Sequence, residues 1–137
     1  MYTAENKNLR SFEDLQCWQA CRDVRIFIHD LVKKYPKEER YSIVDNMKRA
    51  SRSATQNIAE GFRRFHYREN LQFCRISRGS LYELVDDLIT SLDEGFISEE
   101  DYQMGRDKIS NALALLNGYI SYLNRRITHN QSLITNN

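Results

Sequence analysis

Basic side chains able to bind phosphate are concentrated in the middle of the chain. Residues 41–80 carry eight basic and three acidic side chains, whereas residues 81–137 carry four basic and nine acidic ones. The candidate nucleic-acid-binding residues are Lys48, Arg49, Arg52, Arg63, Arg64, Arg68, Arg75 and Arg78. Phe62, Phe65 and Tyr67 lie among them, and aromatic rings can stack on unpaired bases. The pattern indicates either a nucleic-acid interface or a solvated basic face that forms salt bridges with acidic helices.

Asn57, Glu60 and Gly61 form a polar signature where the apolar stripe of a helix should continue. Asn57 and Glu60 are three residues apart, so they share one side of that helix. A buried Glu60 would need a partner, and a nearby arginine such as Arg63 or Arg64 could supply one. The pair could be a binding or acid–base site. The absence of a nearby nucleophile favours a structural network that fixes helix register or a subunit interface.

Motifs for catalysis or metal binding are absent from the sequence. His29, His66 and His129 have no partner at the spacing of a metal site or a catalytic triad. Cys17 and Cys21 share a helix face, and without a nearby histidine they are best explained as core thiols. No glycine-rich phosphate loop or nucleophile elbow occurs. We therefore expect no enzyme activity, no cofactor, no metal and no small-molecule substrate.

Length and composition describe one ordinary globular domain. The 137 residues are 41% hydrophobic and 28% charged, with a net charge of +1, and a chain of this length can bury a hydrophobic core. The odd number of cysteines and the lack of a signal peptide predict reduced thiols in a cytoplasmic protein. Without a run of about eighteen apolar residues, no membrane-spanning helix is expected.

Four amphipathic segments must position these side chains. Apolar residues recur in steps of four and three, which is typical of helices packed in a bundle. The first helix is expected from Ser11 to Tyr35, the second from Ser42, the third over about residues 67–94, and the fourth from Ser98 to about Thr128. Their lengths and short connections predict an all-α fold, an antiparallel up-down-up-down left-handed four-helix bundle. It would span residues 11–128, between a flexible arm (1–10) and a polar tail (129–137).

Capping and glycine patterns mark the ends and contacts of these helices. Ser11, Ser42 and Ser98 each precede an aspartate by three residues, which is the spacing of a capping box. Gly95 suits a left-handed helix C-terminus. Gly61 predicts either a close approach of a neighbouring helix or the start of a turn, and Gly79 with Ser80 predicts another point of close helix contact.

Several stretches together resemble a known family. They are Phe12–Leu15 with Trp18, Tyr35–Glu39, Met47–Ala50, Gln56–Gly61 and Phe73–Leu84. Through them the chain resembles the bacterial four helix bundle protein family, first noticed as open reading frames within intervening sequences of large-subunit ribosomal RNA genes. Members often have Pro-Ser before the asparagine, where this chain has Thr55 and Gln56, and a serine or threonine in place of His66.

The resemblance implies a homopentamer of bundles around a central channel and an association with nucleic acid. A related branch, the accessory variability determinant of diversity-generating retroelements, is a strongly basic pentamer that works with a reverse transcriptase and its RNA. The expected function is a non-enzymatic oligomeric scaffold or adaptor, with RNA or a nucleic-acid enzyme as the partner of the basic middle segment. The alternative is a protein–protein interaction module with no nucleic-acid role.

Overall fold

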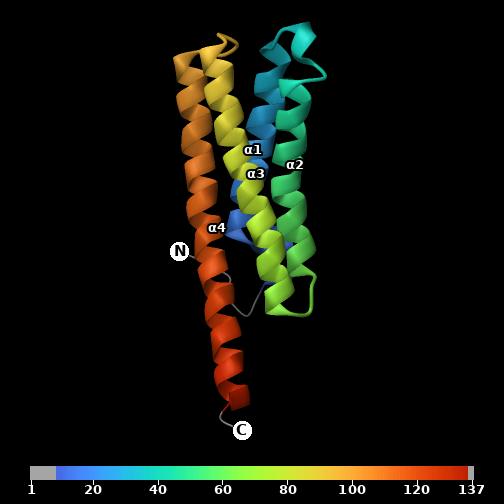
Figure 1. Cartoon of the computed structure of the whole chain (residues 1–137), viewed down its shortest axis with the longest axis vertical. Helices are drawn as coiled ribbons and strands as arrows, with labels where there is room; N and C mark the ends of the chain where they lie inside the picture. The colour runs from blue at the N-terminus through green and yellow to red at the C-terminus, as the bar shows by residue number, and fades with distance from the viewer. Residues whose placement is uncertain (1–8, 136–137) are drawn as a thin grey trace.

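Four long helices packed along one axis make up the computed structural model, which describes residues 9–135 (Figure 1). They are α1 (Gln16–Leu31), α2 (Ile43–Phe62), α3 (Tyr67–Asp93) and α4 (Glu99–Thr135). Three short 3-10 turns complete the described elements: η1 (Phe12–Asp14), η2 (Val32–Lys34) and η3 (Lys37–Glu39). No strand occurs within residues 9–135. The predicted all-α four-helix bundle is confirmed.

Contacts between helix ends show the direction of the chain. The Lys34 ammonium, which follows α1, lies 3.1 Å from a carboxylate oxygen of Asp101 at the start of α4. Asn46 at the start of α2 donates hydrogen bonds to Asp87 near the end of α3. Neighbouring helices therefore run in opposite directions, and the course of the chain in Figure 1 shows the same reversals. The left-handed twist stays a prediction.

The apolar stripes of the four helices meet in one core. Its largest fully buried side chains include Leu15, Ile28, Met47, Ile58, Leu81, Leu84, Leu88, Ile109, Leu116 and Leu123. Burying one such side chain contributes about 1.5–3 kcal/mol. The three cysteines are also buried and unpaired, as expected for core thiols. Burial raises the pKa of Cys21 and Cys74 to about 12, so both stay protonated at neutral pH.

Two of the three predicted serine caps form. Ser11 Oγ accepts a hydrogen bond from the first turn and the Asp14 carboxylate caps the Ser11 backbone in return, but this box starts η1 rather than α1. Ser98 Oγ accepts from the Asp101 backbone at 3.0 Å. The cap predicted at Ser42 is wrong, since its side chain makes no capping bond. Its backbone angles, φ −123° and ψ −111°, lie outside the extended region from which a cap reaches the first turn.

Gly95 ends α3 in the predicted left-handed conformation, with a φ of 78°. Its backbone N–H donates to the Leu92 carbonyl, and the Phe96 N–H donates to the Ser91 carbonyl. This pair of hydrogen bonds defines a Schellman motif. The Phe96 ring then packs against Tyr35, with ring centroids 5.5 Å apart, and covers this end of the core.

The close helix contacts predicted at Gly61 and Gly79 differ in the structure. A Cβ atom on Gly61 would lie 2.6 Å from Asn70 Oδ1, so the close approach of α3 predicted there is confirmed. At the second predicted contact, Ser80 does meet α2, since its Oγ lies 2.8 Å from Ser53 Oγ, but nothing lies within 4 Å of a Cβ atom added to Gly79. The nearby Ser77 and Ser80 face α2 instead, and Gly79 is exposed on another side of the helix.

Helix α4 extends further than the sequence predicted. It runs to Thr135, past Thr128, and its end projects beyond the other helices (Figure 1). Residues 129–135 are therefore helical rather than a frayed tail, and they contain no proline or glycine that would stop a helix. Residues 1–8 of the predicted arm and residues 136–137 lie outside the described residues. In the described part of the chain, none of the helices has the apolar length that crossing a bilayer requires.

Candidate nucleic-acid interface

The eight basic residues singled out in the sequence do not gather on one surface. Arg49 forms an ion pair with Asp45 at 3.2 Å. Arg63 and Arg64 each lie 3.4 Å from an oxygen of Glu60. These three arginines have carboxylate neighbours on α2, and each neighbour offsets part of the positive charge available to an incoming anion.

Three further arginines of the predicted set lie on α3. Arg68 and Arg75 are exposed there. Arg78 donates a hydrogen bond to Asn117 Oδ1 on α4 at 3.0 Å, so it faces α4. These side chains are therefore separated from the two remaining members of the set, which face α1.

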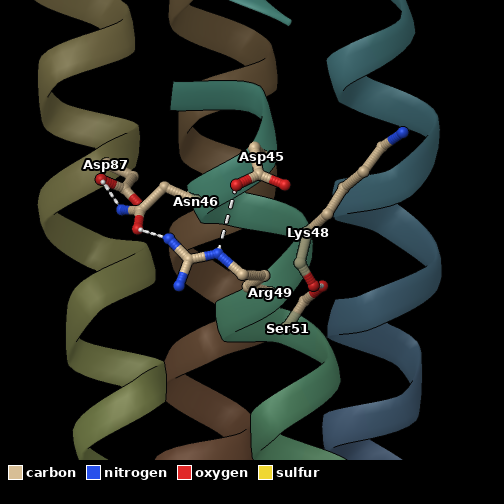
Figure 2. A network of polar contacts seen from close by, with 6 residues as sticks. All are labelled: Asp45, Asn46, Lys48, Arg49, Ser51 and Asp87. Carbon is tan, nitrogen blue, oxygen red and sulfur yellow. Dashed lines mark hydrogen bonds and ion pairs between the residues drawn. The ribbon is translucent and has the colours of Figure 1, made fainter. Parts of the chain in front are cut away.

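Those two members, Lys48 and Arg52, meet two basic residues of α1. The positive charges of Arg52 and Lys48 both lower the pKa of the His29 ring, so these side chains lie near it. One turn away, Arg25 Nη1 donates to Thr55 Oγ1 at 2.8 Å. We call Arg25, His29, Lys48 and Arg52 the cation cluster. It lies across the boundary between α1 and α2, and Figure 2 shows Lys48 extending toward α1.

The cation cluster has no carboxylate partner in the described part of the chain. Within residues 9–134, no ion pair of 4.0 Å or less joins Arg25, Lys48 or Arg52 to an acidic side chain. Burial lowers the pKa of His29, and the charges of Arg52, Lys48 and Arg25 lower it further. Its Nε2 atom is buried and meets no hydrogen-bond partner among the described residues. Uncompensated positive charge of this kind attracts anions such as phosphate.

Sequence reasoning found only half of the cation cluster. Arg25 and His29 were not predicted because they lie on another helix, outside the basic middle segment. The available signal was their spacing, since Arg22, Arg25 and His29 recur every three or four residues along one side of α1.

Aromatic side chains continue the same surface toward the start of α1. The Phe12 and Trp18 rings meet edge to face with centroids 5.2 Å apart, and the Arg22 guanidinium lies 6.0 Å from the centre of the Trp18 ring. Phe12 also lines a pocket of about 590 Å³ at the end of α2. The full lining is Arg10, Ser11, Phe12, Gln56, Ala59, Glu60, Phe62 and Arg63. We call the surface from the cation cluster to this pocket the α1–α2 surface.

The polar signature does not form the suggested buried pair. Asn57 donates to the Ser53 carbonyl and to Ser53 Oγ, at 2.9 and 3.0 Å. Ser53 Oγ accepts a further hydrogen bond from Ser80 of α3 at 2.8 Å. Glu60 pairs with the two arginines named above, and both Asn57 and Glu60 are partly exposed. Asn57 therefore belongs to a polar link that holds α2 and α3 in register.

A second polar link joins α2 and α3 nearer the other end of the bundle (Figure 2). Asn46 donates to both Asp87 oxygens, at 3.3 and 3.0 Å, and accepts a hydrogen bond from Arg49 at 3.1 Å. Arg49 also donates to Asp45. Burial raises the pKa of Asp87 to about 6, although the hydrogen bond from Asn46 opposes that shift. Arg49 thus serves this network rather than the cation cluster.

The fold and this surface define a small helical-bundle protein with a cluster of cations beside a pocket lined by aromatic rings. In the part of the chain that the structure describes, no group of three His, Cys, Asp or Glu side chains could hold a metal ion. The family model of the 23S rRNA-intervening sequence protein matches residues 13–118, a span that includes the whole cation cluster. The chain therefore belongs to the 23S rRNA-intervening sequence protein family, and the resemblance seen in its motifs is confirmed. A search of curated proteins found no match.

Proposed function

We propose that this protein is a non-enzymatic scaffold or adaptor that binds RNA through the cation cluster. The observation that carries the proposal is the convergence of Arg25, His29, Lys48 and Arg52 from two helices, with no carboxylate within ion-pair distance among the described residues. Arg49 on α2 and Arg63 and Arg64 just after it are each paired with a carboxylate of that helix. RNA is the proposed anion because the family resemblance implies an association with nucleic acid and a phosphate backbone presents the anionic groups that such a cluster binds.

An RNA backbone suits this cluster because its phosphates repeat at short intervals. Each contact between a phosphate and a lysine or arginine releases bound counterions, which makes the affinity depend on salt. For a single strand, the slope of log affinity against log salt is about −0.7 per neutralised phosphate. Three permanent cations in the cluster, Arg25, Lys48 and Arg52, therefore predict a contribution of about −2 to that slope.

Fluorescence anisotropy of a dye-labelled single-stranded RNA tests the proposal. Arg25→Ala combined with Arg52→Ala should weaken binding at least about tenfold and reduce the salt slope by about 1–2. The matched control, Arg68→Ala combined with Arg75→Ala, removes the same charge from α3 and should weaken binding by less than about threefold. Circular dichroism checks that both variants remain helical. Equal losses in the two variants would show that overall charge, rather than the cluster, drives binding.

Exposed apolar side chains favour a second candidate function, self-association without an RNA role. Ile26 on α1 and Met104 on α4 are 54% and 47% exposed. Ile26, Phe27 and Lys108 line a groove of about 650 Å³, and Arg25 and His29 of the cation cluster line the same groove. Tyr82 on α3 is 56% exposed. A groove on one copy that receives an exposed side chain of another allows head-to-tail pairing that closes into a ring, which is the geometry of the pentamer that the family resemblance implies.

Light scattering at low and high salt tests this second candidate. The expected result is a stable mass equal to a pentamer of 16.3 kDa chains at both salt concentrations. A monomeric mass at both would contradict self-association. If that monomer bound RNA, the cation cluster rather than a contact between copies would be the functional surface.

A further inference from the structure

We infer that the bound RNA is single-stranded and places one unpaired base in the pocket lined by Phe12, Ala59 and Phe62. This inference rests on the proposed RNA binding and specifies the form of RNA that the α1–α2 surface accepts. Gln56 and Ala59, which line the pocket, come four and seven residues after Arg52 on α2, so they lie on the same side of that helix and one strand reaches both the pocket and the cation cluster.

The pocket has the chemistry of a base-binding site. Phe12 and Phe62 supply two partly buried rings, and Ala59 contributes a small side chain to the wall. The rim carries the amide of Gln56 and the carboxylate of Glu60. Aromatic rings stack on bases, while amides and carboxylates hydrogen bond to base edges. The volume of about 590 Å³ lies within the range of about 300–1,000 Å³ that is usual for small-ligand sites.

Glu60 is held in place at the rim of this pocket. Arg63 and Arg64 each approach one of its oxygens at 3.4 Å, and the Glu60 side chain remains 34% exposed. A carboxylate fixed in this way can accept a hydrogen bond from an N–H group of a base. Its two arginines, together with Arg10 on the rim, offset its repulsion of the phosphates that flank that base.

A line of side chains leads from the pocket to the cation cluster. Trp18 contacts Phe12, and Arg22 lies over the Trp18 ring, one turn before the cluster begins on α1. On α2, Ala59 and Arg52 are two turns apart, or about 10 Å along the axis at about 1.5 Å per residue. Stacked nucleotides rise about 3.4 Å each, so about three of them span this distance. A strand with its base in the pocket therefore brings its next phosphates to the cluster.

A duplex RNA cannot keep its base pairs and also place one base in the pocket while its phosphates contact the cation cluster. Its bases are paired and stacked, and extruding one of them costs a few kcal/mol. A basic groove interleaved with aromatic rings is the arrangement that binds single strands, whose bases are already free to stack on protein. The α1–α2 surface is therefore expected to select single-stranded segments and loops over helical RNA.

An RNA containing 2-aminopurine, a fluorescent base, tests the inference with the full chain. The probe is a short single strand with 2-aminopurine flanked by uridines, and a terminal dye reports binding independently through anisotropy. We expect the 2-aminopurine emission to change at least about twofold when the base stacks on the pocket rings at one position of the strand. A hairpin duplex of matched length should bind at least about tenfold more weakly than the single strand.

A substitution that fills the pocket tests base binding without changing the charge of the protein. Ala59→Leu removes no charge and should abolish the emission change while weakening binding about three- to tenfold. Ala114→Leu, at an exposed position of α4, is the matched control and should change neither quantity. If circular dichroism shows that Ala59→Leu does not fold, Gln56→Ala replaces it, because Gln56 is exposed on the rim. Gln56→Ala should weaken binding of the probe by about threefold.

The possible outcomes distinguish this inference from the proposed function. RNA binding that depends on Arg25 and Arg52 would support the proposed function. If the 2-aminopurine emission then did not change at any position, or if the hairpin bound as tightly as the single strand, the inference of a base in the pocket would be wrong and the proposed function would stand. Failure of the unmodified protein to bind either RNA would overturn both.

Discussion

Asp87 is a carboxylate held by an amide rather than by a cation. It is 8% exposed, and Asn46 donates hydrogen bonds to both of its oxygens. Burial raises its pKa from an ordinary 3.8 to about 6, and the charges of Asp86 and Glu83 act in the same direction. The folded state therefore binds this proton more tightly than the unfolded state does. This tighter proton binding stabilises the folded state, fully so below pH 3.8, and the effect is lost as the pH rises through about 6.

Asp87→Asn should raise the free energy of unfolding at pH 7 by about 1–3 kcal/mol. The substituted amide keeps an acceptor for Asn46 and removes the charge that burial disfavours. Near pH 3, where the carboxyl group is protonated in both states, the variant and the unmodified protein should be about equally stable. Urea unfolding at the two pH values measures the difference, and Asp23→Asn at an exposed position of α1 is the control. A gain of the same size near pH 3 would rule out ionisation as its cause.

His29 is the titratable member of the cation cluster. The charges of Arg52, Lys48 and Arg25 act on it. The groove that His29 lines also carries Asp23, Asp30, Lys33 and Lys108, and Asp30 pairs with Lys33 at 3.6 Å. Burial and the three cations lower the pKa of His29 in the free protein. A phosphate bound in the cluster would offset their repulsion and raise that pKa, so that binding takes up a proton.

RNA affinity should therefore increase as the pH falls from about 7.5 to about 5.5, by up to about tenfold for each unit by which binding raises the pKa of His29. His29→Gln should remove this part of the pH dependence. His129→Gln, at an exposed position of α4, should retain it. Anisotropy titrations at constant ionic strength measure both variants. An unchanged pH dependence in His29→Gln would assign the proton uptake to another group.

At the scale of the elements, small side chains set the distance between α2 and α3. The buried Ser77 hydroxyl donates to the Ala54 carbonyl across the two helices at 2.7 Å. Near the other end of the contact, Gly61 lies against Asn70 and Phe73 with no room for a Cβ atom. Both contacts require short side chains, because a longer one would separate the helix backbones.

Gly61→Ala should lower the free energy of unfolding by about 1–3 kcal/mol, since its Cβ atom would lie 2.6 Å from Asn70 Oδ1 and 3.0 Å from the Asn70 backbone oxygen. Gly79→Ala is the matched control on α3. With nothing within 4 Å of the new atom, it should stabilise the protein by about 0.5–1 kcal/mol through helix propensity. Thermal unfolding compares the two, and stabilisation by Gly61→Ala would mean that α2 and α3 separate freely.

The helices could be predicted from the sequence because their signals are local. The seam through Leu116, Ile120 and Leu123 and the left-handed Gly95 depend on residues within a few turns of each other. The failed cap at Ser42 depends on the path of the preceding turn η3, which no pattern of side chains specified.

The candidate site was harder to predict because neighbours in the chain point in different directions. Lys48 and Arg49 are adjacent, yet about 100° of rotation around α2 sends one toward α1 and the other toward α3. A basic run in the sequence is therefore spread around the bundle. The contact of Arg25 with Thr55 joins residues of two helices, and only the packing of those helices reveals it.

At the scale of the whole molecule, α4 alone continues beyond the shared core (Figure 1). Ile127 is still partly buried against that core. Leu133 and Ile134 are 52% and 73% exposed, on a segment that projects past the other described helices. A helix without a packing partner gains little stability from its own hydrogen bonds, so this segment should be the least stable part of α4.

Removing residues 128–137 should therefore change the free energy of unfolding by less than about 0.5 kcal/mol. In the full chain, backbone amides of residues 128–135 should exchange with solvent with little protection, whereas those near Leu116 should exchange only through global unfolding. Hydrogen exchange and urea unfolding measure these quantities at a protein concentration low enough to keep the chain monomeric. A loss of about 2 kcal/mol on truncation would mean that the projecting segment packs against the bundle. Protection of these amides that appears only at high protein concentration would place Leu133 and Ile134 in a contact between copies, because a second chain would then bury the segment.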